Sequence, residues 1–286
     1  MKGAVFDNGV RDAASTVAPK AWEVLRMRIA KSVRRPRIVR SLISLFILIV
    51  IWELTGRFIL TNKLFFVPLS DIVVTTARLA ASGELERDMA ASFKEIAYGM
   101  ILAVVIGNAF GVLLGASRVV SDYTEVYVNA LYSTPLVAVA PLLILWFGIG
   151  IASKVAVVFI ISVFPIAIST ASGVRNVDFH YLDVAHAFGA TRRQVVVKVL
   201  VPAALPFVLT GVRLAIGRAI VGVVVGEMFG ANAGLGYLIF ASGQTFDVSA
   251  MFSGVICLAF AGVSLTWALQ KLEHRLVRWK PAVLEE

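Results

Sequence analysis

The chain has 286 residues, of which 59% are hydrophobic and only 16% are charged, and its mean hydropathy is +0.86. A soluble globular domain is nearer half apolar and a quarter charged. This composition excludes a disordered chain and argues against an ordinary soluble enzyme. Apolar stretches of about 20 residues indicate a polytopic helical membrane protein instead.

The net charge of +9 is informative through its placement. Nine basic residues precede the first apolar run, which is typical of a cytoplasmic N-terminus under the positive-inside rule: Lys2, Arg11, Lys20, Arg26, Arg28, Lys31, Arg34, Arg35 and Arg37. No basic face is interleaved with stacking aromatic residues, so nucleic acid is not an expected partner.

Cysteine and histidine chemistry is sparse. Cys257 is the only cysteine, which excludes an intramolecular disulfide and a cysteine-based zinc site. His180 and His186 are six residues apart and do not share a helical face, so we expect neither a metal site nor catalytic residues. The first apolar run lacks the pattern of a cleaved signal peptide, and we expect it to be retained as a span.

The expected elements follow in chain order. A basic cytoplasmic segment is expected over residues 1–37. Within it, residues 20–35 predict an interfacial helix that ends at Pro36. Residues 1–19 fit a helix or a disordered tail equally well. A transmembrane domain is expected over 38–272, and a basic cytoplasmic tail over 273–286. The predicted spans are about 39–60, 92–116, 124–148, 154–173, 204–230 and 250–270, the third interrupted by Pro135 and Pro141.

Charge counting supports six spans with both termini in the cytoplasm. Nineteen of the 27 Lys and Arg residues fall on the inner side of this topology, and four fall on the outer side: Lys63, Arg78, Arg87 and Lys154. An odd number of spans would place the basic C-terminal tail outside.

Small residues at four-residue spacing line one face of two spans. Such faces let helix backbones approach closely in lipid, and we leave open whether they serve packing within the chain or a subunit interface or translocation path. They are Gly107, Gly111 and Gly115 in the second span and Gly222, Gly226 and Gly230 in the fifth. In the first span, Glu53 is expected to pair with Arg57 at i,i+4.

The stretch 178–202 is too structured for a plain connector. Asp178 is a suitable N-cap and Gly189 a suitable C′ residue for one helix. Thr191 and Gln194 have the spacing of a capping box for a second helix, which Pro202 is expected to end. The hairpin carries apolar residues that lipid need not cover: Val184, Ala185, Phe188 and Val195. Packing on its own spans and docking of a cytoplasmic partner both explain them.

This hairpin resembles the EAA loop of permeases of ABC importers. That loop reads Glu-Ala-Ala, three residues, Gly, nine residues, Ile, one residue, Leu-Pro, and the matching positions are Asp183-Val184-Ala185, Gly189, Val199 and Val201-Pro202. The spacing is matched throughout and the departures are conservative, although Asp183 has a shorter reach than Glu. The stretches 141–150, 202–206, 211–215 and 234–237 are similar to the nitrate, sulfonate and taurine branch of that family.

The resemblance implies an all-α permease with about six spans in the bacterial inner membrane, pairing with a second copy of itself around a translocation path. It implies two cytoplasmic ATPase subunits, which bind ATP and Mg, and an extracytoplasmic binding protein that delivers a small anion such as a sulfonate, taurine or nitrate. The residues implied in ATPase coupling are Asp183, Val184, Ala185, Phe188, Gly189, Ala190, Val199 and Pro202. The chain has no phosphate-binding loop, so we expect no enzymatic activity and no cofactor of its own.

Polar residues inside the spans are candidates for the path or its gate. Asn129, Ser133 and Thr134 precede Pro135, where a weakened helix could line water, although bonding to nearby backbone would also explain them. Glu227 is a candidate gate, or a carboxylate that is paired or reaches the interface. Arg213 and Arg218 are expected to face lipid headgroups or the ATPase rather than an anionic substrate.

Two other classes of protein remain as alternatives. A stand-alone secondary transporter or channel would need mid-membrane carboxylate pairs or broken-helix repeats, and would act without ATP. A membrane-embedded enzyme would need clustered His, Asp or Glu residues at one membrane face. Neither pattern is found in the sequence.

Overall fold

The computed structural model describes residues 37–60 and 62–277, and these residues are almost entirely helical. The expected interfacial helix over 20–35 and the last residues of the basic tail lie outside them. The chain divides into two compact units, residues 1–59 and 60–286. The described part of the first unit consists of α2 (Arg37–Leu54) and a π-helical turn, η1 (Thr55–Ile59). There the predicted Glu53–Arg57 pair is confirmed at 2.5 Å.

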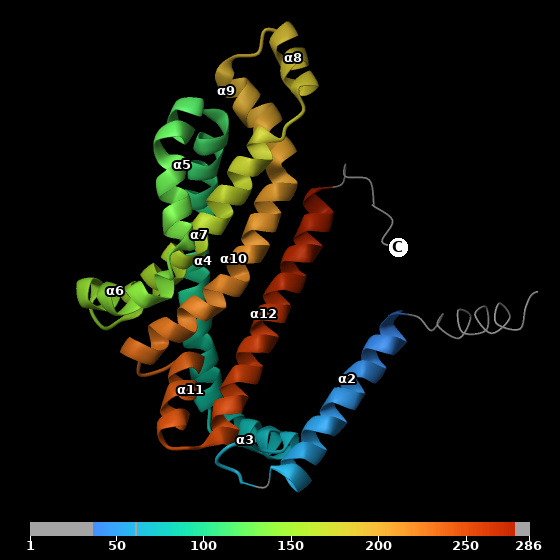
Figure 1. Ribbon diagram of the computed structural model, residues 1–286, viewed down its shortest axis with the longest axis vertical. Helices are drawn as coiled ribbons and strands as arrows, with labels where there is room; N and C mark the ends of the chain where they lie inside the picture. The colour runs from blue at the N-terminus through green and yellow to red at the C-terminus, as the bar shows by residue number, and fades with distance from the viewer. Residues whose placement is uncertain (1–36, 61, 278–286) are drawn as a thin grey trace, which may run out of the picture. The chain divides into compact units, whose positions relative to one another are not determined.

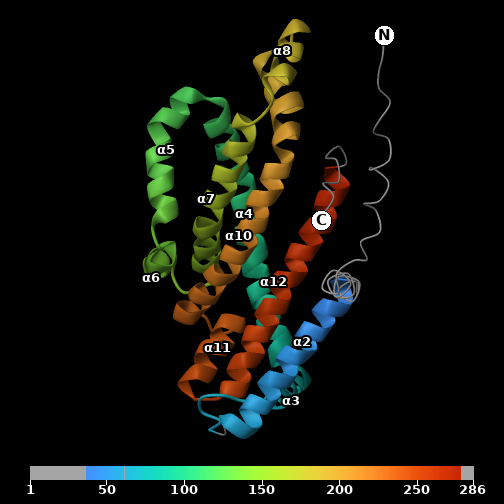
Figure 2. The ribbon, with the colours of Figure 1, turned by 45° about the vertical axis from the view of Figure 1, so that its right-hand side comes forward.

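The second unit is a bundle around three long helices, α4 (Glu84–Ala116), α7 (Ile151–Arg175) and α10 (Val201–Gly230). In Figures 1 and 2, α7 packs along both α4 and α10. The other helices are α3 (Leu69–Ala81), α5 (Arg118–Ser133), α6 (Ala140–Phe147), α8 (Phe179–Ala187), α9 (Arg192–Val195), α11 (Leu235–Gln244) and α12 (Val248–Leu276).

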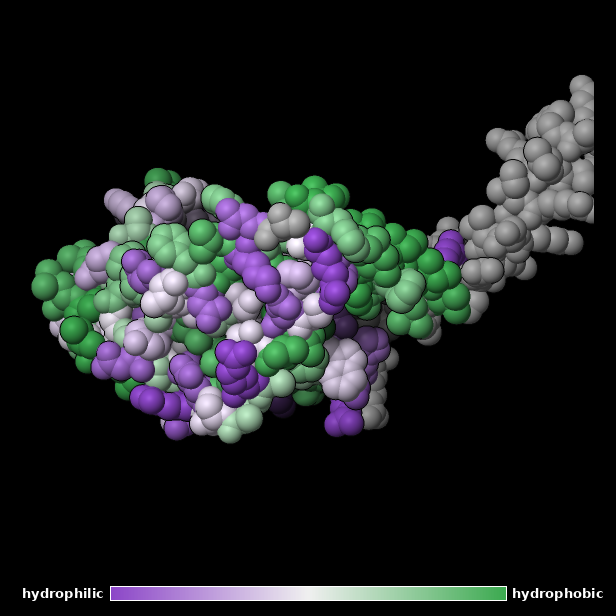
Figure 3. Space-filling model, turned by 90° about the horizontal axis from the view of Figure 1, so that it is seen from below, coloured by the Kyte–Doolittle hydropathy of each residue, from purple (hydrophilic) through white to green (hydrophobic). Residues whose placement is uncertain are grey.

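The two ends of this bundle differ. The hairpin end carries α8 and α9, and the α11 end carries α3 and α11 (Figure 1). Seen from the α11 end, hydrophilic side chains gather on the surface among hydrophobic ones (Figure 3). A mixed surface of this kind fits the boundary between membrane and water.

The glycines of α4 serve close packing within the chain. A Cβ at Gly111 would lie 2.6 Å from the carbonyl oxygen of Ala167, and one at Gly115 would lie 2.6 Å from Cβ of Val174, both on α7. Real side chains do not approach so closely, so these positions need glycine for the two helices to touch. Of the two explanations for the α4 stripe, intramolecular packing is confirmed.

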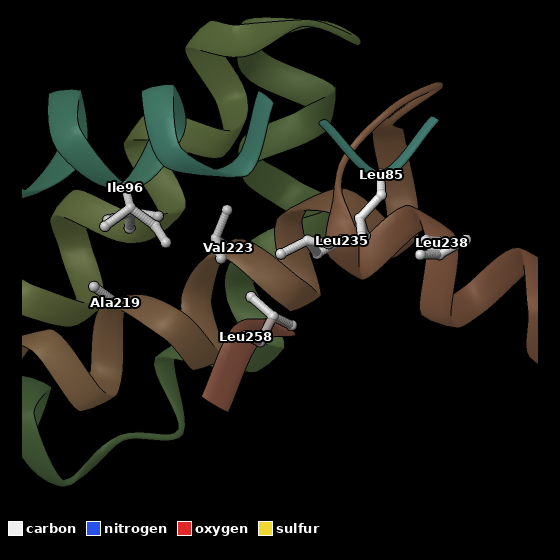
Figure 4. Close-up of a cluster of buried hydrophobic side chains, with 8 residues drawn as sticks. Leu85, Ile96, Ala219, Val223, Leu235, Leu238 and Leu258 are labelled. Carbon is white, nitrogen blue, oxygen red and sulfur yellow. The ribbon is translucent and has the colours of Figure 1, made fainter. Parts of the chain in front are cut away.

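Apolar side chains from four helices close the bundle near its α11 end. Ile96 of α4, Val223 of α10, Leu235 of α11 and Leu258 of α12 are buried in one cluster (Figure 4). Fully burying side chains of this size contributes about 1.5–3 kcal/mol each in water, and here the cluster fixes the short helix α11 against α4, α10 and α12.

The prediction of about six spans is confirmed. Within residues 37–60 and 62–277, five helices are long and apolar enough to cross a membrane, and a sixth span is present if α5 and the segment Leu136–Phe147, bent by 84°, count as one. The predicted third span is therefore broken at Pro135. Thr134 adopts an extended conformation (φ −73°, ψ 139°), as expected of a residue before proline, and the α-helix cannot continue through it.

The prediction that Pro202 ends the second hairpin helix is wrong. Residues Arg192–Gly230 form one helical segment of 39 residues, in which a π-helical turn, η3 (Val196–Leu200), directly precedes α10. Proline lacks an N–H to donate to the carbonyl four residues earlier. The π turn changes the hydrogen-bonding register immediately before Pro202, so the helix accommodates the proline and runs on into the bundle.

Candidate functional site

The hairpin end is shaped by three local signals, each confirmed in the structure. The Asp178 carboxylate accepts a hydrogen bond from the His180 N–H at 2.9 Å and caps α8. Gly189 ends this helix with φ +70°, a conformation that favours glycine. The Thr191 N–H donates to Gln194 Oε1 at 2.8 Å, and the Gln194 N–H donates back to Thr191 Oγ1 at 3.4 Å, which completes the capping box.

One face of the hairpin packs on its own helices. Its half-buried side chains lie against a buried cluster of Val174, Val177, Val195, Leu200 and Ala204, and they are Leu182, Ala185, Ala190 and Val199. Three of the predicted coupling residues are therefore on this inner face. The packing explanation holds for them, and it anchors the hairpin firmly to α7 and α10.

The other face of the hairpin is apolar and uncovered by the described residues. Phe188 is 88% exposed and Val184 is 56% exposed, and Tyr181 is exposed on the same side of α8. Asp183 is also exposed. Clustered apolar side chains at the end of a bundle mark an interaction surface. We call Tyr181, Val184 and Phe188 the outer face; their contact with an ATPase stays a prediction.

At the α11 end, Glu227 is fully buried and its carboxylate is held from two sides. Ser92 of α4 donates to Glu227 Oε1 at 2.5 Å, and the Gly236 N–H of α11 donates to Oε2 at 2.6 Å. Glu227 therefore neither reaches the interface nor faces an open path in this conformation. Its role as a gate stays a prediction.

Three consecutive N–H groups at the start of α11, those of Gly234, Leu235 and Gly236, are bound by side chains from other helices. Ser92 Oγ accepts from the Leu235 N–H at 2.8 Å, and Asp88 Oδ1 accepts from the Gly234 N–H at 2.9 Å. Together with Glu227, these groups satisfy the free donors and oppose the positive end of the helix dipole. The start of α11 is thereby fastened to α4 and α10.

A buried ion pair completes this cluster. Lys154 Nζ of α7 lies 3.2 Å from Glu95 Oε1 of α4, with side chains only 9% and 5% exposed. The Glu95 carboxyl in turn lies beside that of Glu227. Sequence reasoning missed the α4 part of this cluster and placed Lys154 in a loop. The spacing of Asp88, Ser92 and Glu95 (i, i+4, i+7) was the available signal, since it puts all three on one helical face.

The predicted path residues on α5 have mixed surroundings. Thr134 donates its hydroxyl to the Ala130 carbonyl of its own helix at 2.8 Å, whereas Ser133 is exposed. Asn129 lines a cavity of about 400 Å³ together with Glu125 and Arg175. Glu227 of α10 is not near these residues of α5; it belongs to the buried cluster with α4, α7 and α11.

The two arginines of α10 differ from the prediction that both face headgroups or a partner. Arg213 forms an ion pair with Glu273 of α12. Arg218 reaches toward α5, where its guanidinium carbon lies 4.4 Å from the ring centre of Tyr132. The structure therefore gives each arginine a partner within the bundle.

The sequence over residues 99–278, more than half of the chain, matches the family described as binding-protein-dependent transport system inner membrane component. The chain belongs to this family. Its members are the permease subunits of ABC importers, and the hairpin described above lies where their EAA loop is expected.

Named relatives agree with this assignment of the permease. It is 33% identical to the putative aliphatic sulfonates transport permease protein SsuC of Bacillus subtilis, over 85% of this chain and 88% of the relative. It is 34% identical to the formylaminopyrimidine transport permease protein ThiX of Halalkalibacterium halodurans, over 82% and 92%. It is 28% identical to the taurine transport system permease protein TauC of Escherichia coli, over 85% and 90%.

Solved structures show the same fold. An inward-facing form of the MetNI methionine ABC transporter matches with a TM-score of 0.58 at 23% identity, covering 70% of this permease and 97% of that chain. A chain of an amino acid ABC transporter matches with a TM-score of 0.53 at 20% identity, covering 72% and 96%. At these identities the likeness concerns the fold alone.

Proposed function

We propose that this permease forms a translocation path with a second copy of itself, and that two cytoplasmic ATPase subunits drive it. ATP and Mg bind to those subunits, and an extracytoplasmic binding protein delivers the solute. The excess of basic residues on the hairpin side of the topology supports a cytoplasmic hairpin and cytoplasmic termini.

The outer face of the hairpin is the observation that carries this proposal. Its apolar side chains lie at the end of the bundle, where Phe188 is 88% exposed, and they would lie in water unless a partner covered them. The inner face holds the hairpin rigidly on α7 and α10. A protein that binds the outer face would therefore move these helices and not just the hairpin.

The continuous helix from the hairpin supplies a route for coupling. Residues Arg192–Gly230 run as one helical segment from α9 to the buried cluster at Glu227. A shift imposed on the hairpin would reach the α11 end through this segment. Nucleotide-bound and nucleotide-free ATPases that bind the outer face differently would then favour different arrangements of the bundle.

A small anion is the proposed solute. Two of the relatives are named as aliphatic sulfonate and taurine permeases, and both kinds of solute contain a sulfonate group. A third relative is named for formylaminopyrimidine, which widens the range of solutes to be tested.

Copurification of the tagged chain with its ATPase, followed by uptake in proteoliposomes, tests this function. We expect two copies of each subunit, and uptake of a radiolabelled sulfonate only when ATP and the binding protein are present. A Phe188→Asp variant should lose the ATPase. The control is Phe246→Asp, because Phe246 is 70% exposed at the α11 end. A chain that purifies alone and transports without ATP would support a secondary transporter instead.

A further inference from the structure

Arg218 lies deep inside the longest helical segment of the bundle. At about 1.5 Å per residue, it is about 18 Å along the helix axis from Gly230 and about 26 Å from Val201. A hydrocarbon core is about 30 Å thick, so this position falls within it. A charged side chain at that depth is costly, and such residues commonly face a water-filled path.

Arg218 differs from the other buried or half-buried basic residues of the bundle. Among the Lys and Arg residues whose side chains the structure describes, three are buried or half-buried: Lys154, Arg213 and Arg218. Lys154 is paired with Glu95, and Arg213 with Glu273. Arg218 has no carboxylate within ion-pair distance in the described part of the chain, and its recorded partner is the ring of Tyr132.

Stacking on a tyrosine ring leaves the hydrogen-bonding edge of a guanidinium free. The Arg218 guanidinium carbon is 4.4 Å from the Tyr132 ring centre, which is a cation–π arrangement. The ring face stabilises the charge but does not use the five N–H donors in the plane of the group. Those donors match the oxygens of a carboxylate, phosphate or sulfonate in a bidentate fashion.

Two residues next to this pair in the chain, Gly217 and Ser133, are exposed in the bundle. A Cβ added at Gly217, the neighbour of Arg218, would meet no atom within 4 Å. Ser133 follows Tyr132 directly and is exposed, at the point where the third span breaks. These exposed neighbours fit a location of the Arg218–Tyr132 pair near the surface of the bundle and not in its packed core.

We propose that Arg218, held against the ring of Tyr132, is an anion-binding position on the translocation path, which takes the oxyanion end of a small solute. This inference rests on the proposed function, because it presumes that the α5–α10 side of the bundle faces the path. A single arginine binds an anion weakly enough for release, as a path requires of each position along it.

Charge-selective labelling of a single cysteine tests the position without knowledge of the natural solute. The full-length permease carries Cys257→Ala, which removes its only cysteine, together with Ser133→Cys. The probes are two water-soluble methanethiosulfonates of similar size, one ending in a sulfonate and the other in a trimethylammonium group. The ratio of their reaction rates in purified permease reports the local potential.

We expect the anionic reagent to react faster at Ser133→Cys, and Arg218→Gln to lower the anion-to-cation rate ratio by about tenfold, at the low end of what a focused charge achieves. Arg218→Lys should keep most of the preference for the anionic reagent. This result would show that Arg218→Gln acts by removing the charge and not by misfolding the protein. A cysteine at Phe246 is the control, where Arg218→Gln should change nothing. Millimolar ethanesulfonate should slow labelling at Ser133→Cys only while Arg218 is present.

Two results would overturn the proposal. One is a Ser133→Cys that neither water-soluble reagent modifies, since this side would then face lipid or packed protein. The other is a rate ratio that Arg218→Gln leaves unchanged. Either result, found in a permease that still copurifies with its ATPase, removes the anion position and leaves the proposed function standing. If the permease does not copurify with an ATPase but the rate ratio still depends on Arg218, the proposed function is contradicted and the anion-binding position is retained.

Discussion

The Ser92 hydroxyl of α4 donates a 2.5 Å hydrogen bond to the Glu227 carboxylate of α10 inside a fully buried cluster. The same hydroxyl accepts from the Leu235 N–H, so one small side chain joins three helices. Since α10 continues from the hairpin, we expect a shift of the hairpin to act on this junction. The strength of the junction can be measured by substitution.

Removing the Ser92 hydroxyl should destabilise the bundle. Ser92→Ala leaves Glu227 Oε1 and the Leu235 N–H buried without this partner, and an unsatisfied buried group costs about 1–3 kcal/mol. We expect a lower thermal unfolding midpoint in detergent. Thr210→Ala is the control, because that exposed hydroxyl bonds only to the Pro206 carbonyl of its own helix. Equal effects of the two substitutions would contradict the junction.

Replacing Lys154 or Glu95 alone should lower the free energy of unfolding far more than replacing both together. Lys154→Met strands the buried Glu95 carboxylate, and breaking a buried ion pair in this way costs about 3–5 kcal/mol in soluble proteins. The double variant Lys154→Met, Glu95→Leu should recover much of that loss. The free energies of unfolding of both single variants and the double variant give the coupling. Additive effects would show that the two residues do not act as a pair.

Gly234 should tolerate alanine much less well than Gly189, although both have positive φ angles of +127° and +70°. A Cβ at Gly234 would run into the Glu227 carboxylate, whereas one at Gly189 would meet nothing within 4 Å. Gly189→Ala should cost only the backbone strain of about 1–2 kcal/mol. Gly234→Ala should also detach the start of α11. Yield and unfolding midpoint of the two variants compare them directly, and similar losses would refute the packing of Glu227 on this turn.

Much of the fold was predictable because its signals are local or compositional. Long apolar runs gave the spans, and Asp178, Gly189 and Thr191 marked the boundaries of the hairpin helices. The course of the chain at Pro202 was not predictable from a rule about proline alone, because a π turn accommodates it. The break at Pro135 was visible as an interruption, but the 84° bend depends on packing.

The candidate site was predictable in part, for a related reason. The hairpin motif identifies coupling residues by spacing, but spacing does not tell Ala185, on the inner face, from Val184, on the outer face. The cluster around Glu227 joins residues more than 100 positions apart, and Arg218 meets Tyr132 across two helices. The spacing of Asp88, Ser92 and Glu95 shows one polar face of α4, but which residues meet that face is determined by tertiary packing.

The two faces of the hairpin should respond differently to the same charge. Val184→Glu places a carboxylate on the outer face, so the permease should fold normally and lose its ATPase. Ala185→Glu places it against the buried cluster around Val195, where an unpaired charge is strongly unfavourable. We expect a loss of folded protein for this variant. Size-exclusion profiles and ATPase copurification distinguish the two outcomes, and a well-folded Ala185→Glu permease would contradict the inner-face packing.

Crosslinking from the outer face tests the central claim most directly. A photoreactive amino acid at Phe188 in the full-length permease, irradiated in intact membranes, should give a single major adduct that mass spectrometry identifies as the ATPase subunit. The same amino acid at Phe246, exposed at the other end of the bundle, should not give that adduct. Adducts from Phe188 to lipid alone, or ATPase adducts of equal yield from Phe246, would contradict the docking of an ATPase on this hairpin.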